Sequence, residues 1–441
     1  MNFSLRSVAR TAGCIALLLS FVSRLPAAEP AYETKPDHPF FQKFAPRKAA
    51  APAGLQLKEN DRVAICGDSI TEQKMYSRIL ETYLTVCVPQ LKVTTRQFGW
   101  GGETGPGFIA RMTNDVLRFK PTLATTCYGM NDHGYRAYEP AIGQRYREAM
   151  ETLVRAFTNA GARVILGSPG CVGPAVPWSK AKSEDMNLNL CELRNIDIEI
   201  ATADGVGFAD VFWPMYKAMF FATQRYGDVY HLAGKDGVHP DWAGHLVMAY
   251  TFLKALGLDG QIGTVTVDLQ ALKATATPGH EVLGFTDDIV KVTSHRYPFC
   301  ASGEINKDNT IRSGMKLVPF NAELNRFVLV VTNATAPRYM VTWGDGYRTY
   351  TREQLAKGVN LAEDYVINPF TAAFNKVDEA VAAKEAYETR QIKMLFHGDE
   401  GRADMEATVA LTEKARQAYV DALAATVVPV THTIKIAAQS Q

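Results

Sequence analysis

The chain has 441 residues, of which 47% are hydrophobic and 21% are charged, and its formal net charge is +1. This composition is typical of a soluble globular protein, and the length favours one large domain together with a smaller second one. The near-zero charge argues against a nucleic-acid partner, because binding to phosphates requires clustered lysine and arginine.

The first residues have the layout of a secretory signal peptide. Arg6 and Arg10 precede an apolar run over residues 14–22, and small residues follow at 25–28. We therefore expect residues 1–28 to be removed on export, which would leave a periplasmic or secreted protein without stable membrane insertion. The apolar run is shorter than the roughly 20 helical residues that a bilayer requires. An uncleaved anchor is the alternative.

The region after the signal peptide has two parts. Residues 29–58 are rich in proline, alanine and lysine and lack periodicity, so we expect a linker or a surface arm. From residue 59 onward the pattern is regular. Short apolar runs typical of buried strands occur at 62–66, 91–98, 122–128, 162–166 and 207–210. Helical patterns alternate with them at 75–88, 114–119, 145–160 and 240–256.

This alternation predicts an α/β domain over residues 59–257. Strands that alternate with helices form a parallel sheet with helices on both faces. The expected architecture is therefore a three-layer α/β/α domain around a doubly wound sheet. In such sheets, ligands bind outside the carboxyl ends of the strands.

Residues 258–441 have a different pattern, which predicts a β-rich segment followed by helices. Short alternating runs begin at residue 263, and the glycines around Asp345 favour a hairpin turn. Thr351 and Gln354 have the spacing of a capping box at the start of a helix. A longer helical stretch is expected over residues 371–394.

Two glycine-containing motifs follow the first two predicted strands. Asp68 and Ser69 stand after Gly67 at a strand-to-helix turn, where a serine hydroxyl can project from the start of a helix. The second motif runs from Gly99 to Thr104, and its glycines allow the backbone to approach a bound group closely. Each motif alone is more typical of an ordinary helix cap or tight turn.

Two further motifs complete the set. Asn131 follows the third long strand, and a side-chain amide near a nucleophile can donate to an oxyanion. Asp236 and His239 are three residues apart, so the carboxylate can hold the imidazole in one tautomer while the other nitrogen accepts a proton. These two residues could instead bind a metal with His231 and His245, although no motif unites the four.

In this chain order, the four motifs resemble the conserved blocks of the SGNH, or GDSL, hydrolase superfamily. The resemblance covers about residues 59–257 and implies a flavodoxin-like sheet. It also implies that Ser69 is the nucleophile, that Asp236 and His239 complete a triad, and that the oxyanion hole is formed by the Ser69 and Gly102 N–H groups and the Asn131 amide. The first block reads Gly-Asp-Ser-Ile rather than Gly-Asp-Ser-Leu, which is an apolar change that leaves the chemistry intact.

The residues of the second and third blocks are similar to those of bacterial secreted lipase-like acylhydrolases, in which a β-rich segment and helices often follow the catalytic domain. Residues adjoining the blocks are candidates for substrate binding: Asp68, Trp100, His133 and Tyr135. The expected reaction is acyl transfer to water without metal or organic cofactor.

The expected substrate is a small-molecule or polysaccharide ester, above all an acetylated carbohydrate outside the cell. Lipid esterase or lysophospholipase activity, sugar O-acyltransferase activity and non-catalytic glycan binding are the alternatives. Export also permits disulfides without requiring them. Cys171 and Cys191 flank a polar, proline-containing loop, and both a bridge and two free thiols are open for this pair.

Overall fold

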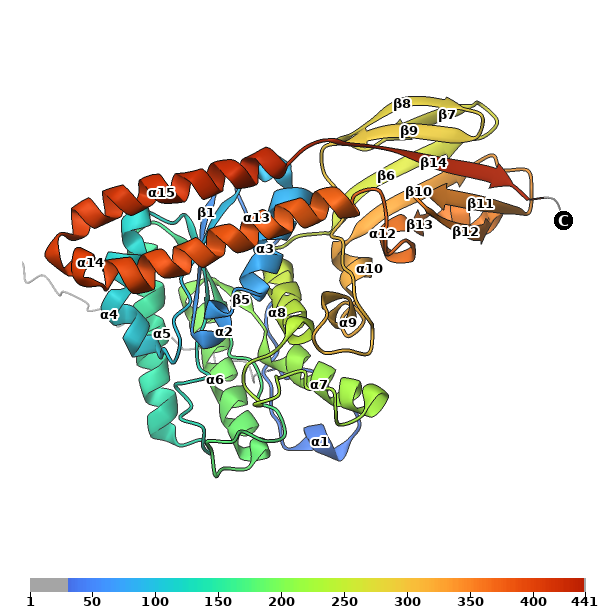
Figure 1. Ribbon diagram of the computed structural model, residues 1–441. Helices are drawn as coiled ribbons and strands as arrows, with labels where there is room; N and C mark the ends of the chain where they lie inside the picture. Colours follow the sequence, from blue (N-terminus) through green and yellow to red (C-terminus); the bar gives the residue numbers. More distant parts are fainter. Residues whose placement is uncertain (1–30, 440–441) are drawn as a thin grey trace, which may run out of the picture.

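The computed structural model describes residues 31–439, so the expected signal peptide at residues 1–28 lies outside the described residues. Within them, a parallel sheet forms the centre of the first half of the chain, and two further sheets lie in the second half (Figure 1).

The parallel sheet has the strand order β2-β1-β3-β4-β5. All four neighbouring pairs are parallel. This order is that of a flavodoxin-like doubly wound sheet, in which the chain reverses direction beside the first strand. The strands are β1 (Arg62–Gly67), β2 (Thr94–Gln97), β3 (Leu123–Cys127), β4 (Arg163–Gly167) and β5 (Gly207–Ala209). The predicted fold class is confirmed.

Helices cover both faces of this sheet. Alternate residues of β1 enter two different apolar clusters: Val63 and Ile65 join the residues of α3 and α8, whereas Ala64 and Cys66 join those of α4 and α5. Side chains of a strand alternate between faces, so the sheet is the middle of three layers. The helices are α2 (Ser69–Glu72), α3 (Tyr76–Cys87), α4 (Gly105–Asp115), α5 (Pro140–Asn159), α6 (Ser183–Asp204), α7 (Phe212–Tyr226) and α8 (Trp242–Ala255).

An arm precedes this domain and is packed against it. Helix α1 (Pro39–Gln42) brings Phe41 into the core, and Phe44 follows it there. The rings of both residues contact Trp213 and Tyr216 of α7. The segment at residues 29–58 was expected to be a linker or a surface arm, and its described residues are an anchored arm.

The second half of the chain begins as two sheets that share a core. Phe327 from one sheet stacks on Trp343 from the other, with 5.4 Å between ring centroids. One sheet contains β13 (Val359–Asn360), β10 (Arg326–Thr332), β6 (Gln261–Asp268) and β7 (Lys273–Ala276). The other contains β12 (Gly346–Thr351), β11 (Arg338–Trp343), β14 (Val430–Ala438), β9 (Ile289–Ser294) and β8 (His280–Thr286). We call these two sheets the sandwich.

A helical hairpin leaves the sandwich, lies across the parallel-sheet domain and returns as β14 (Figure 1). It consists of α13 (Thr371–Arg390), the π-helix η3 (Gln391–Phe396), α14 (Asp399–Ala403) and α15 (Met405–Thr426). Shorter helices occur elsewhere: η1 (Pro89–Leu91), η2 (Leu117–Phe119), α9 (Ile311–Gly314), α10 (Phe320–Leu324), α11 (Arg352–Lys357) and α12 (Leu361–Asp364). The capping box expected at Thr351 and Gln354 is present at the start of α11.

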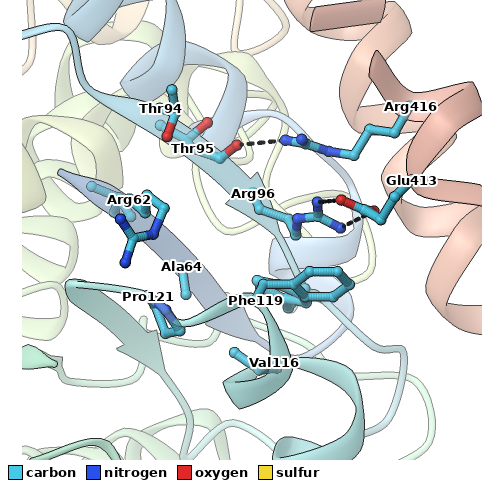
Figure 2. Close-up of a pocket in the computed structure, with 12 residues that line it drawn as sticks. Arg62, Ala64, Thr94, Thr95, Arg96, Val116, Phe119, Pro121, Glu413 and Arg416 are labelled. Atoms are coloured by element: carbon cyan, nitrogen blue, oxygen red, sulfur yellow. Dashed lines mark hydrogen bonds and ion pairs between the residues drawn. The ribbon is translucent and has the colours of Figure 1, made fainter. Parts of the chain in front are cut away.

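Charged contacts join this hairpin to the parallel-sheet domain. Figure 2 shows Arg96 of β2 paired with Glu413 of α15, and Arg416 donating to the carbonyl of Thr95. The Arg96 guanidinium also lies 3.6 Å from the centre of the Phe119 ring. The edge of the parallel sheet at β2 is therefore covered, which protects its unpaired backbone groups.

Of the two outcomes that the sequence leaves open for Cys171 and Cys191, the structure has the free thiols. Both residues are free and buried, as are the other four cysteines of residues 31–439. Cys171 and Cys191 both belong to the larger apolar cluster, where a thiol packs as a small hydrophobic group. In the same range, no helix is long and apolar enough to span a membrane.

Candidate active site

Ser69 lies at the turn between β1 and α2, at the carboxyl edge of the sheet. The Asp68 carboxylate caps α2 by accepting the N–H of Ile70 at 2.9 Å. Gly67 is required before it, since a Cβ there would collide with Thr71 and the Cys127 carbonyl. Ser69 is therefore the first residue of α2. The first N–H groups of this helix have no partner within the helix and face the carboxyl edge of the sheet.

His239 connects Ser69 to Asp236. Its Nε2 lies 2.8 Å from the Ser69 Oγ, and its Nδ1 lies 2.7 Å from Oδ2 of Asp236. The other carboxylate oxygen accepts the N–H groups of Val238 and His239, each at 2.9 Å. Partial burial raises the pKa of Asp236, but these N–H groups and the ring of His239 outweigh burial, so its pKa lies below the ordinary value. An ionised Asp236 holds a proton on Nδ1 and leaves Nε2 free to accept one.

The backbone around His239 is fixed from two sides. Gly234 has a φ of +90° and packs against the His239 carbonyl, where a Cβ would collide. From α2, the Gln73 amide donates to the Pro240 carbonyl at 3.0 Å. Gln73 also contacts the buried ring of His245. His245 is thus a structural residue next to the site, and burial lowers its pKa to about 3.

Gly102 and Asn131 lie at the same edge of the sheet. The Asn131 side-chain amide donates to the carbonyl of Glu103, the residue after Gly102, at 2.9 Å. An amide group has two N–H bonds, so one remains for a ligand. Neither the N–H of Ser69 nor that of Gly102 donates a hydrogen bond within residues 31–439.

The residues predicted to bind substrate have different surroundings. Tyr135 is partly exposed, and its hydroxyl donates to the Asn131 Oδ1 at 3.1 Å. His133 is fully buried beneath it, with ring centroids 4.7 Å apart, and burial lowers its pKa to about 4. His133 therefore supports Tyr135 rather than lining an open surface.

Asp68 and Trp100 also have contacts that the sequence did not indicate. Asp68 is buried beneath the turn that carries Ser69, and burial raises its pKa to about 7, with Asp132 and Glu103 contributing. The Trp100 ring lies 5.0 Å from the ring of His397, which follows η3. Trp100 is therefore at the junction with the helical hairpin.

Two features of the site could not be found from sequence. Trp178 is 52% exposed, and its ring lies 6.5 Å from that of His239 and 5.6 Å from that of Tyr135. It stands in an irregular loop, where an isolated tryptophan gives no signal. Beside His239 there is also a pocket of about 430 Å³ whose lining includes charged, polar and apolar residues: Gln73, Met75, His231, Gly234, Lys235, Asp236, His239, Pro240, Asp241 and Asp308.

A metal at this site receives no support from the described residues. Residues 31–439 contain no group of three or more His, Cys, Asp or Glu side chains arranged to hold a metal ion. The backbone N–H of His231 donates to Asp308 at 2.9 Å, and the His245 ring contacts α2 and α3. Both ring nitrogens of His245 therefore have protein partners.

The chain resembles one known protein family and several solved structures. Residues 65–247 match the model of the GDSL-like lipase/acylhydrolase family. A search of the curated proteins finds no match. Among solved structures, a gut microbial diltiazem-metabolizing enzyme, BT4096, is 21% identical and has a TM-score of 0.70, with 88% of this chain and 100% of that chain covered. This likeness extends the shared fold beyond the catalytic domain to most of the chain.

Two smaller solved proteins cover 46% of this chain at a TM-score of 0.39 each. One is LAE5, an α/β hydrolase from the metagenome of Lake Arreo, Spain, with 22% identity over 98% of its length. The other is Axe2, an acetylxylan esterase from Geobacillus stearothermophilus, with 20% identity over 97% of its length.

The family match contains the turn that carries Ser69, the loop of Gly102 and Asn131, and the segment of Asp236 and His239. The domain at residues 65–247 therefore belongs to the GDSL-like lipase/acylhydrolase family, and the chain is a serine hydrolase that acts on ester bonds.

Proposed function

We propose that this protein is an exported esterase that removes short acyl groups, above all acetyl, from carbohydrates. The observation that carries the catalytic part is the chain of two hydrogen bonds that runs from Asp236 through His239 to Ser69. The pattern at residues 1–28 supports export.

In the first step, the Ser69 Oγ attacks the ester carbonyl while its proton moves to Nε2 of His239. Asp236 stabilises the imidazolium that forms. His239 then donates this proton to the alcohol oxygen, the ester bond breaks and an acyl-enzyme remains on Ser69. In the second step His239 removes a proton from water, which attacks the acyl-enzyme and releases the carboxylic acid.

The negative charge on the carbonyl oxygen requires donors during both steps. We assign this task to the N–H groups of Ser69 and Gly102 and to the free N–H of the Asn131 amide. Each of these three groups has an N–H that donates no hydrogen bond to the described residues. One such donor typically contributes about 3 kcal/mol to the stability of the transition state.

The surroundings of His239 favour a carbohydrate as the alcohol part of the ester. The pocket beside it is lined by several carboxylates, a lysine and a histidine, which can bind hydroxyl groups. On another side, the exposed Trp178 and the half-buried Tyr135 offer aromatic surface suited to the apolar face of a sugar ring. A long lipid acyl chain would instead require an extended apolar pocket.

The test of the catalytic proposal compares the wild type with Ser69→Ala. The wild type should react covalently with a fluorophosphonate probe and hydrolyse 4-nitrophenyl acetate, whereas Ser69→Ala should do neither. A wild type that neither labels nor hydrolyses would support a glycan-binding protein instead. Labelling that survives Ser69→Ala would assign the nucleophile to another residue.

The test of the substrate proposal uses acetylated xylan, acetylated monosaccharides and a lysophospholipid. Diltiazem, which carries an acetyl ester, joins this panel because a protein of the same fold is a diltiazem-metabolizing enzyme. Release of acetate from the carbohydrates with the highest kcat/KM supports the proposal, and preferential cleavage of the lysophospholipid contradicts it. Transfer of acetyl to an added sugar faster than to water would identify an acyltransferase.

A further inference from the structure

The Gly102 N–H belongs to a tight turn that the two glycines leave free to change. The N–H of Glu103 donates to the Trp100 carbonyl at 3.2 Å, so Gly101 and Gly102 are the central residues of a β-turn. Of these two, only Gly102 has a positive φ, +72°, which is the pattern of a type II turn. The Gly102 N–H lies in the central peptide, and rotation of that peptide converts type II into type I.

This rotation would move the Gly102 N–H away from its position in the structure. Side chains normally restrict such a change, but two consecutive glycines have no Cβ to oppose it. The orientation of this N–H must therefore be fixed by contacts from outside the turn.

Glu72 of α2 supplies one such contact. One of its carboxylate oxygens accepts the N–H of Gly101, the first central residue of the turn. The other oxygen accepts Nζ of Lys393 at 2.6 Å. Glu72 is three residues after Ser69, whereas Lys393 lies in η3 of the helical hairpin. One carboxylate thus connects the nucleophile helix, the glycine turn and the hairpin.

The same part of the hairpin also encloses Trp100, the first residue of the turn. Nζ of Lys393 lies 5.1 Å from the centre of the Trp100 ring, and the His397 ring meets it edge-on at 5.0 Å. His397 is itself held by Asp115 of α4 at 2.8 Å. The wider turn of a π-helix is frequent at functional sites, and here it presents Lys393 and the segment of His397 to the glycine turn.

We infer that Glu72 and Lys393 are positioning residues that hold the Gly102 N–H in the orientation needed for the oxyanion hole, so that the helical hairpin completes the active site. The inference rests on the proposed function of Ser69 and Gly102. The inference gives residues 371–426 a role in catalysis, because they fix the orientation of the Gly102 N–H, which belongs to another part of the chain.

The first experiment compares Lys393→Ala with Lys414→Ala, which removes an exposed lysine of α15 that has no ion pair within residues 31–439. Lys393→Ala should lower kcat on 4-nitrophenyl acetate roughly tenfold or more, since it weakens an oxyanion donor, and leave KM within about twofold. Lys393→Arg, which keeps the cation, should retain most of the activity. Lys414→Ala should match the wild type.

The second experiment distinguishes positioning from simple attachment of the hairpin. Exchanging the charges in Glu72→Lys/Lys393→Glu restores an ion pair, but the ammonium group that replaces the Glu72 carboxylate cannot accept the Gly101 N–H. The exchange should therefore restore the melting temperature lost in Lys393→Ala but not kcat. Recovery of kcat together with the melting temperature would contradict the inference, because attachment alone would then suffice.

Ser69→Ala is measured in the same series. An inactive wild type, or an active Ser69→Ala, would overturn the proposed function itself. An active wild type and an inactive Ser69→Ala, together with Lys393→Ala that turns over at the wild-type rate, would overturn only the inference. If Lys393→Ala does not fold, the comparison of Lys393→Arg with the charge exchange decides the question.

Discussion

Asp236 serves two purposes with its two oxygens. Oδ1 closes its own turn by accepting the N–H groups of Val238 and His239, and Oδ2 contacts Nδ1 of His239. The first set of bonds fixes the carboxylate, and the second fixes the imidazole. A spacing of three residues is sufficient because all partners belong to one turn.

Replacing Asp236 with Asn separates these purposes. Asparagine keeps an oxygen for the two backbone N–H groups, but its amide would favour the wrong tautomer of His239. We expect kcat to fall by about 10³- to 10⁴-fold with little loss of stability. Steady-state kinetics and thermal melting of Asp236→Asn check this, and a loss below tenfold would remove Asp236 from the proposed triad.

Sequence alone could indicate Ser69, Asn131, Asp236 and His239, because each stands in a short local motif. It gave no signal for Glu72 or Lys393, which are 321 positions apart and meet only in the folded chain. The fully buried position of His133 was equally invisible, since burial depends on what packs over a loop.

At the scale of elements, one chain of hydrogen bonds crosses the core of the sandwich. The Trp343 indole N–H can only donate, so Nδ1 of His432 accepts it at 3.1 Å. The Nε2–H of His432 then donates to Ser294, the Ser294 hydroxyl donates to Nδ1 of His280, and Nε2–H of His280 donates to the Ile262 carbonyl. Both histidines must be neutral for this order.

Acid should therefore weaken the sandwich. Burial lowers the pKa of His432 to about 3, whereas an unfolded histidine titrates near about 6.5. Between these values the unfolded state binds the extra proton, so the free energy of unfolding falls as the pH falls. His432→Gln should reduce this pH dependence by up to about 1.4 kcal/mol per pH unit. Urea unfolding at pH 7 and pH 5 measures it, and equal slopes for both proteins would refute the assignment.

The elements that sequence predicted best are those with local signals. The strands of the parallel sheet alternate with turns that contain glycine, so β1, β3 and β4 were found. Helix α6 was missed because it is buried on several sides and carries buried polar residues, among them Asn189 and Asp197, so its sequence has no clear apolar face. Strand β14 was missed because it pairs with β9, far back in the chain, which leaves no local turn signal.

At the scale of the whole molecule, the catalytic domain and the helical hairpin share a buried ionic cluster. Lys384 of α13 is 2% exposed and lies 3.0 Å from Glu81 of α3 and 2.9 Å from Glu388. Its Nζ also donates to the Thr95 carbonyl. One ammonium group at the sheet edge is thus shared by two buried carboxylates, of which Glu388 also pairs with Arg416.

Removing this ammonium should destabilise the protein strongly. Lys384→Met keeps the apolar stem but leaves the carboxylates of Glu81 and Glu388 without this partner, and we expect a loss of about 3–5 kcal/mol in the free energy of unfolding. Lys92→Met breaks an exposed pair with Glu59, which water and salt screen, and should leave the free energy of unfolding close to that of the wild type. Urea titrations of both variants test the contrast, and similar losses would contradict the burial argument.

The place of β14 has a consequence for biosynthesis. This strand lies between β9 and β11 in the middle of its sheet, and the hairpin that precedes it has both ends tied to the sandwich. During synthesis, the segments that carry Ser69, Asp236 and His239 are therefore translated well before the last strand of the sandwich. Lys393 can meet Glu72 only once η3 has been translated. On the role we infer for Lys393, we expect full turnover only after this residue has been translated, later than the segments that carry Ser69, Asp236 and His239.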